Sequence, residues 1–334
     1  MQIKRVLVEE AALDYPMGER VHRHFKGLGT PVLVARRPSF PDLEGMEEPA
    51  AYREAKSTLY IGVRRVTRFE ACKPSADFQL PLLSGCGGMC EYCYTHTRVG
   101  TRPYLRLYVN TEEIFNMADG YVQQRLPGKT TFELAASSDP LFFEPFSGMV
   151  SECVLHFARR ETAFLRIATK FDCVDTLVGL EHSGHTSLRF SVNAHSVARR
   201  YEHALPDVEL RIAAAGKVAS AGYPTGFMIA PVFLYDGWQE DYLDVLRRIR
   251  QSVKDIPVTF EVIAHRFTPR AKESIQKIFP ATTLDMDETA RKFKFGQFGY
   301  GKYVYSKEQY DELKAFFREH ITALFGPGAL LYIV

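Results

Sequence analysis

Short apolar runs and longer amphipathic stretches alternate from the start of the chain. Apolar runs at residues 6–8 and 31–34 flank an amphipathic stretch over 16–27, which predicts two strands connected by a helix. Residues 37–49 are rich in proline and polar side chains and are expected to form a loop. Residues 1–77 are therefore predicted to form a small α/β extension.

From about residue 78 the pattern changes to short β-rich runs separated by longer helical stretches. Strands are predicted over residues 104–109, 130–135, 164–169, 187–192, 226–232 and 258–263. Helices are predicted over residues 111–124, 147–160, 172–180, 208–221, 238–253 and 307–325. Runs such as 165–169 are apolar on both faces, as expected for parallel strands covered by helices.

This regular alternation predicts an α/β fold with a partial (β/α)6 TIM-type barrel over residues 78–265. Periodicity alone also fits an open doubly wound sheet. In a barrel, the chemistry is expected at the carboxyl ends of the strands. Residues 266–334 are predicted to form a C-terminal unit, in which two aromatic, lysine-rich runs around glycines at 291–303 indicate a hairpin before the last helix.

The composition is ordinary for a globular protein, with 46% hydrophobic and 25% charged residues. No apolar stretch approaches the roughly 18 residues of a membrane-spanning helix, and no secretory signal is recognisable, so a cytoplasmic protein without a membrane partner is expected. Its six cysteines should then be reduced. A net charge of +2 neither requires nor excludes a nucleic-acid partner.

Three of the cysteines lie in one glycine-rich segment, LSGCGGMCEYCY at residues 83–94. Cys86, Cys90 and Cys93 have the spacing C-x3-C-x2-C, which lets three thiolates face one [4Fe–4S] cluster. The fourth iron stays free to chelate S-adenosylmethionine (SAM) and reduce its sulfonium. A zinc site completed by His96 is the alternative, although zinc sites usually pair cysteines from two separate knuckles.

An aromatic residue, Tyr92, precedes the last cysteine, and the whole motif resembles the radical SAM signature. Longer segments resemble one branch of that superfamily, the spore photoproduct lyase family, and they run in one order over nearly the whole chain. These segments are YPMGERVHRHF (15–25), AKSTLYIGVRR (55–65), KPSADFQLPLLSGCGGMCEYCY (73–94), RPYLRLYVN (102–110), LRIATKF (165–171), RIAAAGKVASAGYPTGFMIAPVFLYDGW (211–238), AHRFT (264–268) and GYGKYVY (299–305).

The resemblance implies a barrel of the radical SAM type and a lyase that repairs the spore photoproduct, 5-thyminyl-5,6-dihydrothymine, in double-stranded DNA. A 5′-deoxyadenosyl radical would take hydrogen from C6 of the dihydrothymine, and the methylene bridge would break by β-scission. A cysteine would then donate hydrogen, and SAM would be re-formed. An external one-electron reductant of the flavodoxin or ferredoxin type, a monomer and a location in the spore core are also implied.

The chain departs from the family pattern at the hydrogen-donor position. The family segment resembling F-E-A-x-C-T-S-D corresponds to residues 132–139, and the donor position is Ala136, which has no S–H bond. We predict that Cys72 folds back over the cluster and replaces the donor; a merely buried cysteine is the alternative. Cys153 and Cys173 are expected to be structural. The departure also leaves open a radical SAM paralogue with another nucleic-acid or small-molecule substrate, and a zinc-stabilised nucleic-acid-binding module remains the non-catalytic alternative.

The resemblance also implies roles for polar residues at the strand ends. Ser138, Lys170, Ser191 and Asn193 are expected to hold SAM together with Tyr92, with Lys170 at the SAM carboxylate. Tyr92 and Tyr94 are expected to relay the hydrogen atom, and Tyr94 is the better placed of the two.

Lesion and DNA contacts are expected from the basic aromatic hairpin and its surroundings. Cations there can bind phosphate while aromatic rings occupy the space left by an extruded lesion. The DNA-binding candidates are Arg266, Lys294, Gln297, Phe298 and Lys302, and Arg64, Arg65, Arg270 and Lys292 are expected in the same patch. Gln297 stands where relatives tend to have arginine.

Overall fold

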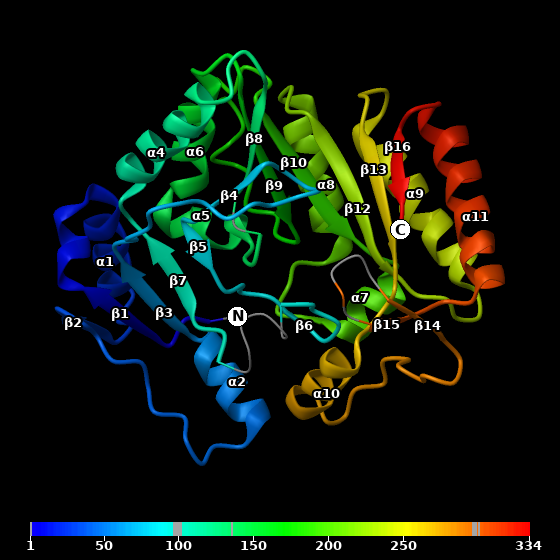
Figure 1. The fold of residues 1–334 in the computed structure, drawn as a ribbon, viewed down its shortest axis with the longest axis horizontal. Helices are drawn as coiled ribbons and strands as arrows, with labels where there is room; N and C mark the ends of the chain where they lie inside the picture. Colours follow the sequence, from blue (N-terminus) through cyan, green and yellow to red (C-terminus); the bar gives the residue numbers. More distant parts are fainter. Residues whose placement is uncertain (1, 96–101, 135, 296–298, 300) are drawn as a thin grey trace.

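Two β-sheets, flanked by helices, organise the chain in the computed structural model, which describes residues 2–95, 102–134, 136–295, 299 and 301–334. The smaller sheet lies on the side of the N-terminal helix α1 (Pro16–Gly27), and the larger sheet extends to the C-terminal helix α11 (Lys307–Phe325) (Figure 1).

The first sheet has five strands in the order β2-β1-β3-β7-β5, and only β5 is antiparallel to its neighbour. Its strands are β1 (Arg5–Glu9), β2 (Val32–Ala35), β3 (Thr58–Gly62), β5 (Leu83–Ser84) and β7 (Leu105–Tyr108). Between β1 and α1 lies a 3-10 turn, η1 (Glu10–Asp14), and α1 buries Met17, Val21 and Phe25 at the i, i+4, i+8 spacing of one helix face.

The strand predicted over 104–109 is therefore present, but it joins the first sheet rather than the barrel. It pairs with β3, and β5 pairs with its other edge. The end of the stretch expected to be a loop also starts a helix, α2 (Glu48–Lys56), which leads directly into β3.

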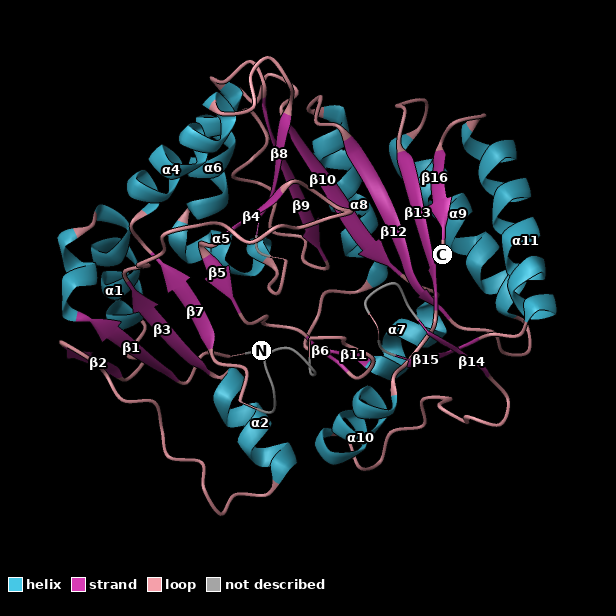
Figure 2. Ribbon diagram, in the orientation of Figure 1, coloured by secondary structure: helices cyan, strands magenta, loops and turns pink. Residues whose placement is uncertain are grey.

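The second sheet has seven parallel strands in the order β16-β13-β12-β10-β9-β8-β4. Helices cover one face of this curved sheet, as a partial TIM-type barrel requires and a doubly wound sheet does not (Figure 2). Its strands are β4 (Phe78–Leu80), β8 (Thr130–Leu134), β9 (Ala163–Thr169), β10 (Thr186–Val192), β12 (Thr225–Val232), β13 (Thr259–Ala264) and β16 (Leu330–Ile333). Its helices include α4 (Thr111–Gln123), α5 (Pro140–Ser147), α6 (Met149–Ala158), α8 (Val208–Ser220) and α9 (Trp238–Val253).

Shorter elements connect these layers. They are β6 (Met89–Cys90), α7 (His195–Tyr201), β11 (Glu202–His203), α10 (Pro269–Ile278), β14 (Lys292–Phe295) and β15 (Gly301–Val304). The predicted hairpin is confirmed, since β14 and β15 pair antiparallel. The last helix matches its predicted range, and it begins at a capping box formed by Ser306 and Gln309.

The helix predicted over 172–180 is wrong. Val174 and Leu177 are buried three residues apart, which imitates a helical face. The backbone there makes isolated turns instead, with the Val174 N–H donating to Asp172 and the Leu177 N–H donating to Val174.

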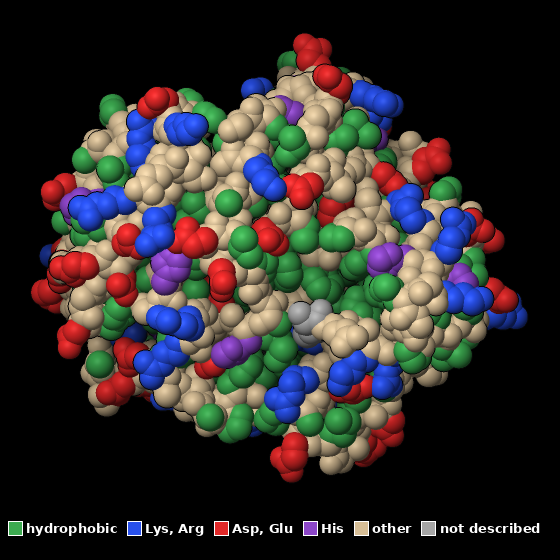
Figure 3. Space-filling model, turned by 180° about the vertical axis from the view of Figure 1, so that it is seen from behind, with side chains coloured by type: hydrophobic (Ala, Val, Ile, Leu, Met, Phe, Trp, Pro, Cys, Tyr) green, Lys and Arg blue, Asp and Glu red, His purple; other side chains and the backbone are tan. Residues whose placement is uncertain are grey.

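No helix within the described ranges is long and apolar enough to cross a membrane. Basic and acidic side chains are interspersed on the rear face of the molecule, where hydrophobic side chains gather near the centre (Figure 3). A polyanion site must therefore be sought in local clusters of positive charge rather than in an overall field.

Candidate active site

The three-cysteine segment links the two sheets. It leaves the first sheet after β5, and β6 then pairs with β11, with Cys90 opposite Glu202. Ser138, just after β8, donates its hydroxyl proton to the Gly85 carbonyl, and Lys170, just after β9, reaches Tyr92. The segment therefore lies at the carboxyl ends of the barrel strands, as predicted.

The glycines of this segment are required by close packing. Gly85 has a φ of +77°, and an added Cβ would lie 2.5 Å from the Tyr104 carbonyl oxygen. A Cβ on Gly87 would meet the ring of Phe142 at 2.2 Å, and one on Gly88 would meet Leu205 at 2.7 Å. The backbone is thus held in a tight cradle that presents the cysteines.

Burial favours the neutral form of two of these thiols. It raises the pKa of Cys86 to about 12 and that of Cys90 well above its ordinary value. A metal that compensates the negative charge would stabilise their thiolate forms, so the cysteine segment fits an iron–sulfur cluster. Among the described side chains, no three His, Cys, Asp or Glu residues are arranged around a single metal ion. His96, the candidate fourth zinc ligand, lies outside the described residues.

A buried lysine that the sequence analysis missed fastens the cradle to α2. Lys56 is only 4% exposed, and its Nζ donates to the Cys86 carbonyl oxygen at 2.8 Å and also to the Gly88 carbonyl. The family-like segment at 55–65 contains Lys56, but its residue type gives no hint of a partner so distant in sequence.

Replacing Lys56 with methionine should therefore destabilise the protein. Each buried carbonyl left without a donor costs roughly 1–3 kcal/mol. We expect a clear fall in the urea midpoint of the iron-free protein and faster iron release after reconstitution. Lys277→Met, which removes an exposed lysine paired with Glu273 on α10, is the matched control. An unchanged urea midpoint for Lys56→Met would contradict this role.

A second buried group, which the sequence did not reveal, lies behind the segment. The Glu202 carboxylate accepts a hydrogen bond from Lys170 Nζ at 2.7 Å and from the Tyr92 hydroxyl, and it pairs with Arg211 at 2.5 Å. Burial alone would raise the pKa of Glu202, but Lys170 and Arg211 outweigh this effect and hold the pKa at about 2. The predicted Lys170 and Tyr92 are therefore brought together around an unpredicted carboxylate.

Glu202→Gln should cost roughly 3–5 kcal/mol at neutral pH, because two buried cations lose their counter-charge. The folded pKa of Glu202 lies below its ordinary value of 4.5, so its contribution is complete above about pH 4.5 and is lost as the pH falls toward 2. Urea titrations at pH 7 and pH 3 should show the gap between wild type and variant narrowing in acid. A gap that does not depend on pH would contradict the assignment.

The other strand-end residues differ in whether their polar groups are already hydrogen-bonded within the protein. Asn193 is fully buried, with its amide donating to the Pro231 carbonyl at 2.8 Å and its Oδ1 accepting from Tyr242 at 2.7 Å. The Ser191 carbonyl accepts from Arg211. Neighbouring Asp139 joins the ends of β8 and β9 by accepting from Thr169 and from the Lys170 N–H, and burial raises the pKa of Asp139 to about 6.

The tyrosine predicted as a hydrogen relay lies beside the position of the missing donor. The Tyr94 hydroxyl donates to the Ala136 carbonyl oxygen at 2.6 Å. Cys153, in contrast, is fully buried against Met149, and Cys173 is half-buried beside Asp172.

Cys72 begins a turn that the barrel interior anchors through Ser75. The Ser75 hydroxyl donates to Glu133 of β8 at 2.5 Å, and its carbonyl accepts from Arg166 of β9, also at 2.5 Å. Arg189 of β10 donates to the Ser75 hydroxyl at 3.2 Å. Three barrel strands thus hold the turn that carries the half-buried Cys72.

The basic hairpin forms a local cluster of positive charge. Lys294 and Lys302 face each other across β14 and β15. The Phe267 backbone forms a bridge with Tyr303, which places Arg266 beside the hairpin. Partial burial and the nearby Arg266 and Lys294 lower the pKa of Lys302. Gln297 and Phe298 lie outside the described residues. Arg64 and Arg65, which were expected in the same patch, instead lie at the end of β3 in the first sheet.

A partial parallel barrel with a three-cysteine C-x3-C-x2-C segment at its carboxyl end is the scaffold of a radical SAM enzyme. The family model of spore photoproduct lyase matches residues 1–334. This chain therefore belongs to the spore photoproduct lyase family.

Individual relatives match over almost their whole length. A spore photoproduct lyase of Clostridium acetobutylicum is 42% identical over 331 residues, covering 99% of this chain and 98% of the relative. A solved spore photoproduct lyase complexed with dinucleoside spore photoproduct superimposes with a TM-score of 0.92 at 38% identity, covering 99% of this chain and 98% of that one. A double mutant with bound AdoMet and the same dinucleoside, in which a cysteine becomes alanine and a serine becomes cysteine, also gives a TM-score of 0.92, at 39% identity and with the same coverage.

Proposed function

We propose that this chain reverts the spore photoproduct in double-stranded DNA to two thymines, with a [4Fe–4S] cluster on Cys86, Cys90 and Cys93 and with SAM. The observation that carries this proposal is the cysteine cradle at the carboxyl end of a barrel whose chain matches the family throughout. When bound, the cluster and SAM supply a 5′-deoxyadenosyl radical, which can remove the unactivated C6 hydrogen that no acid or base of ordinary pKa can take.

The residues around the cradle would then bind and orient SAM. Lys170, held by Glu202, would attract the SAM carboxylate, while Tyr92 and Ser138 would form the adjacent wall. Asn193 would act by positioning, because its amide already connects β10 to Pro231 and Tyr242. Ser191 would lie beside it at the same strand end.

We propose Cys72 as the hydrogen donor. Loss of the C6 hydrogen breaks the methylene bridge and leaves a radical on the methylene carbon of the released thymine. The Cys72 S–H bond would break and a C–H bond would form on that carbon. The hydrogen taken from C6, then carried by 5′-deoxyadenosine, would return through Tyr94 to the sulfur, and this would restore the adenosyl radical from which SAM is re-formed. The solved double mutant supports this choice, since its removed and added cysteines are as far apart along the chain as Ala136 and Cys72.

The remaining partners follow from this reaction. The cluster formed by Arg266, Lys294 and Lys302 would contact DNA phosphates near the lesion. Gln297 and Phe298, which lie between β14 and β15 in the sequence, would contribute to the same contact. A flavodoxin- or ferredoxin-type protein would supply one electron. We place the reaction in the cytoplasm of the spore, carried out by a monomer.

The decisive experiment is anaerobic incubation of the reconstituted, reduced protein with SAM and the isolated dinucleotide lesion. Thymine release is the expected result. Formation of 5′-deoxyadenosine without thymine would indicate a radical enzyme with another substrate, and a colourless protein with one zinc per chain would indicate a non-catalytic module; either outcome would overturn the proposal. Cys153→Ala, which changes a buried cysteine outside the site, is the control expected to retain repair.

A further inference from the structure

A large groove at the carboxyl edge of the first sheet has no role in the reaction described above. Strands β1, β2, β3 and β7 are parallel, so their carboxyl ends meet at one edge, where open α/β sheets commonly bind ligands. The groove there has a volume of about 1000 Å³. Five arginines line it: Arg36, Arg37, Arg64, Arg65 and Arg106.

Most of this positive charge is uncompensated. Arg65 pairs with Glu9 at 2.8 Å, whereas the other four arginines have no carboxylate within 4 Å among the residues that the structure describes. The buried Nε of Arg64 makes no hydrogen bond to any described group. Guanidinium groups that have no carboxylate partner are suited to bidentate contacts with phosphate.

Aromatic rings lie between the arginines. The Arg106 guanidinium is 5.1 Å from the centre of the Phe40 ring, and the Arg64 guanidinium is 4.9 Å from the centre of the Tyr108 ring. These cation–π contacts hold the guanidinium planes in place and leave their N–H groups able to contact phosphates.

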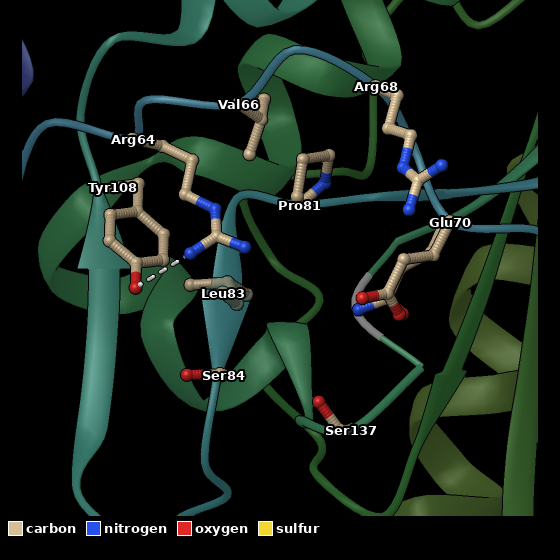
Figure 4. Close-up of a pocket in the computed structure, with 10 residues that line it drawn as sticks. Arg64, Val66, Arg68, Glu70, Pro81, Leu83, Ser84, Tyr108 and Ser137 are labelled. Carbon is tan, nitrogen blue, oxygen red and sulfur yellow. Dashed lines mark hydrogen bonds between the residues drawn. The ribbon is translucent and has the colours of Figure 1, made fainter.

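The groove continues toward the reaction centre. A smaller cavity of about 230 Å³ shares Arg64 and Tyr108 with it and extends to Ser84 and Ser137 (Figure 4). Ser137 directly follows Ala136, whose carbonyl oxygen accepts a hydrogen bond from the Tyr94 hydroxyl. A strand bound in the groove can therefore continue into the site of the proposed lesion chemistry.

We propose that this arginine groove binds the backbone phosphates of the DNA that flanks the lesion. The inference rests on the proposed function for the identity of the nucleic acid. It adds a second contact region, separate from the hairpin cluster of Arg266, Lys294 and Lys302, which lies across the molecule from the first sheet (Figure 1).

The test measures binding of a lesion-containing duplex and, separately, repair of the isolated dinucleotide lesion. Arg36→Glu/Arg37→Glu should weaken binding of a lesion-containing duplex of about 20 base pairs by tenfold or more at low salt. It should also reduce the slope of log affinity against log salt by about 2, one for each lost phosphate contact. Repair of the dinucleotide, which has no flanking strand, should change less than twofold.

Arg247→Glu/Arg318→Glu is the matched control. It makes the same change in net charge at two exposed arginines on α9 and α11, on the opposite side of the molecule, and it should leave duplex binding within about threefold of wild type. The milder Arg36→Gln/Arg37→Gln variant, checked by circular dichroism, separates loss of contacts from misfolding and should show a smaller loss of the same kind.

Three results would overturn the proposal: unchanged duplex affinity in the groove variant, an equal loss in the control pair, or competition by inorganic phosphate or a mononucleotide as strong as by duplex. The last result would indicate a small-anion site. If wild type fails to repair the dinucleotide, the proposed function fails, while the duplex-binding comparison still decides whether the groove binds DNA.

Discussion

Cys90→Ala should remove the iron–sulfur cluster and abolish both 5′-deoxyadenosine formation and thymine release. Cys90 is the most buried of the three cysteines, and its backbone is paired with Glu202 at the junction of the segment with β11. With two thiolates left, the cradle cannot retain four irons against chelation. Iron should fall from about four per chain to near zero, and absorbance near ~400 nm should disappear.

The control for this experiment is again a buried cysteine. Cys153→Ala removes a fully buried thiol of α6 that donates a hydrogen bond to Met149 on the same helix, and the variant should keep its iron and its activity. Retention of a full complement of iron by Cys90→Ala, or equal loss from Cys153→Ala, would show that the cluster is held elsewhere.

Cys72→Ala should lower clean thymine formation at least about tenfold and produce aberrant products, because the thymine methylene radical has no S–H bond to quench it. A thiol hydrogen exchanges with solvent, so repair by wild type in D₂O should place deuterium in the thymine methyl group. Product chromatography with mass spectrometry measures both effects.

The chain itself offers a rescue for this variant. Cys72→Ser/Ala136→Cys moves the thiol to the position beside the Tyr94 hydroxyl and should restore clean repair. Cys173→Ala is the control, since its sulfur lies beside Asp172 and not on the anchored turn. Clean repair by Cys72→Ala at the wild-type rate, or product without solvent deuterium in wild type, would eliminate Cys72 as the donor.

Local sequence patterns predicted the features that depend on neighbours in the chain. The hairpin lies where the aromatic and glycine residues of 291–303 indicated it, and the last helix matches the range that its helical pattern predicted. The β-rich run at 104–109 correctly predicted a strand, but such a run carries no information about which sheet the strand joins.

The supports of the site are long-range contacts, which no local pattern encodes. Lys56 contacts carbonyls some thirty residues away, and Glu202 meets Tyr92 more than a hundred residues away along the chain. The short helices α5 and α10 were also missed, since each carries too few turns to establish a helical period. Such supports are visible only after the fold brings them together.

The cysteine segment connects the two sheets, which limits where the chain can be truncated. Its entry strand, β5, depends on β7, and β7 in turn depends on β3 and β1. A truncation that removes residues 1–77 to isolate a minimal catalytic barrel would therefore delete β3, which pairs with β7. It would also delete Lys56, which donates to the Cys86 carbonyl. The N-terminal extension is therefore not a separable module. A fusion protein that carries the barrel would also need the whole first sheet.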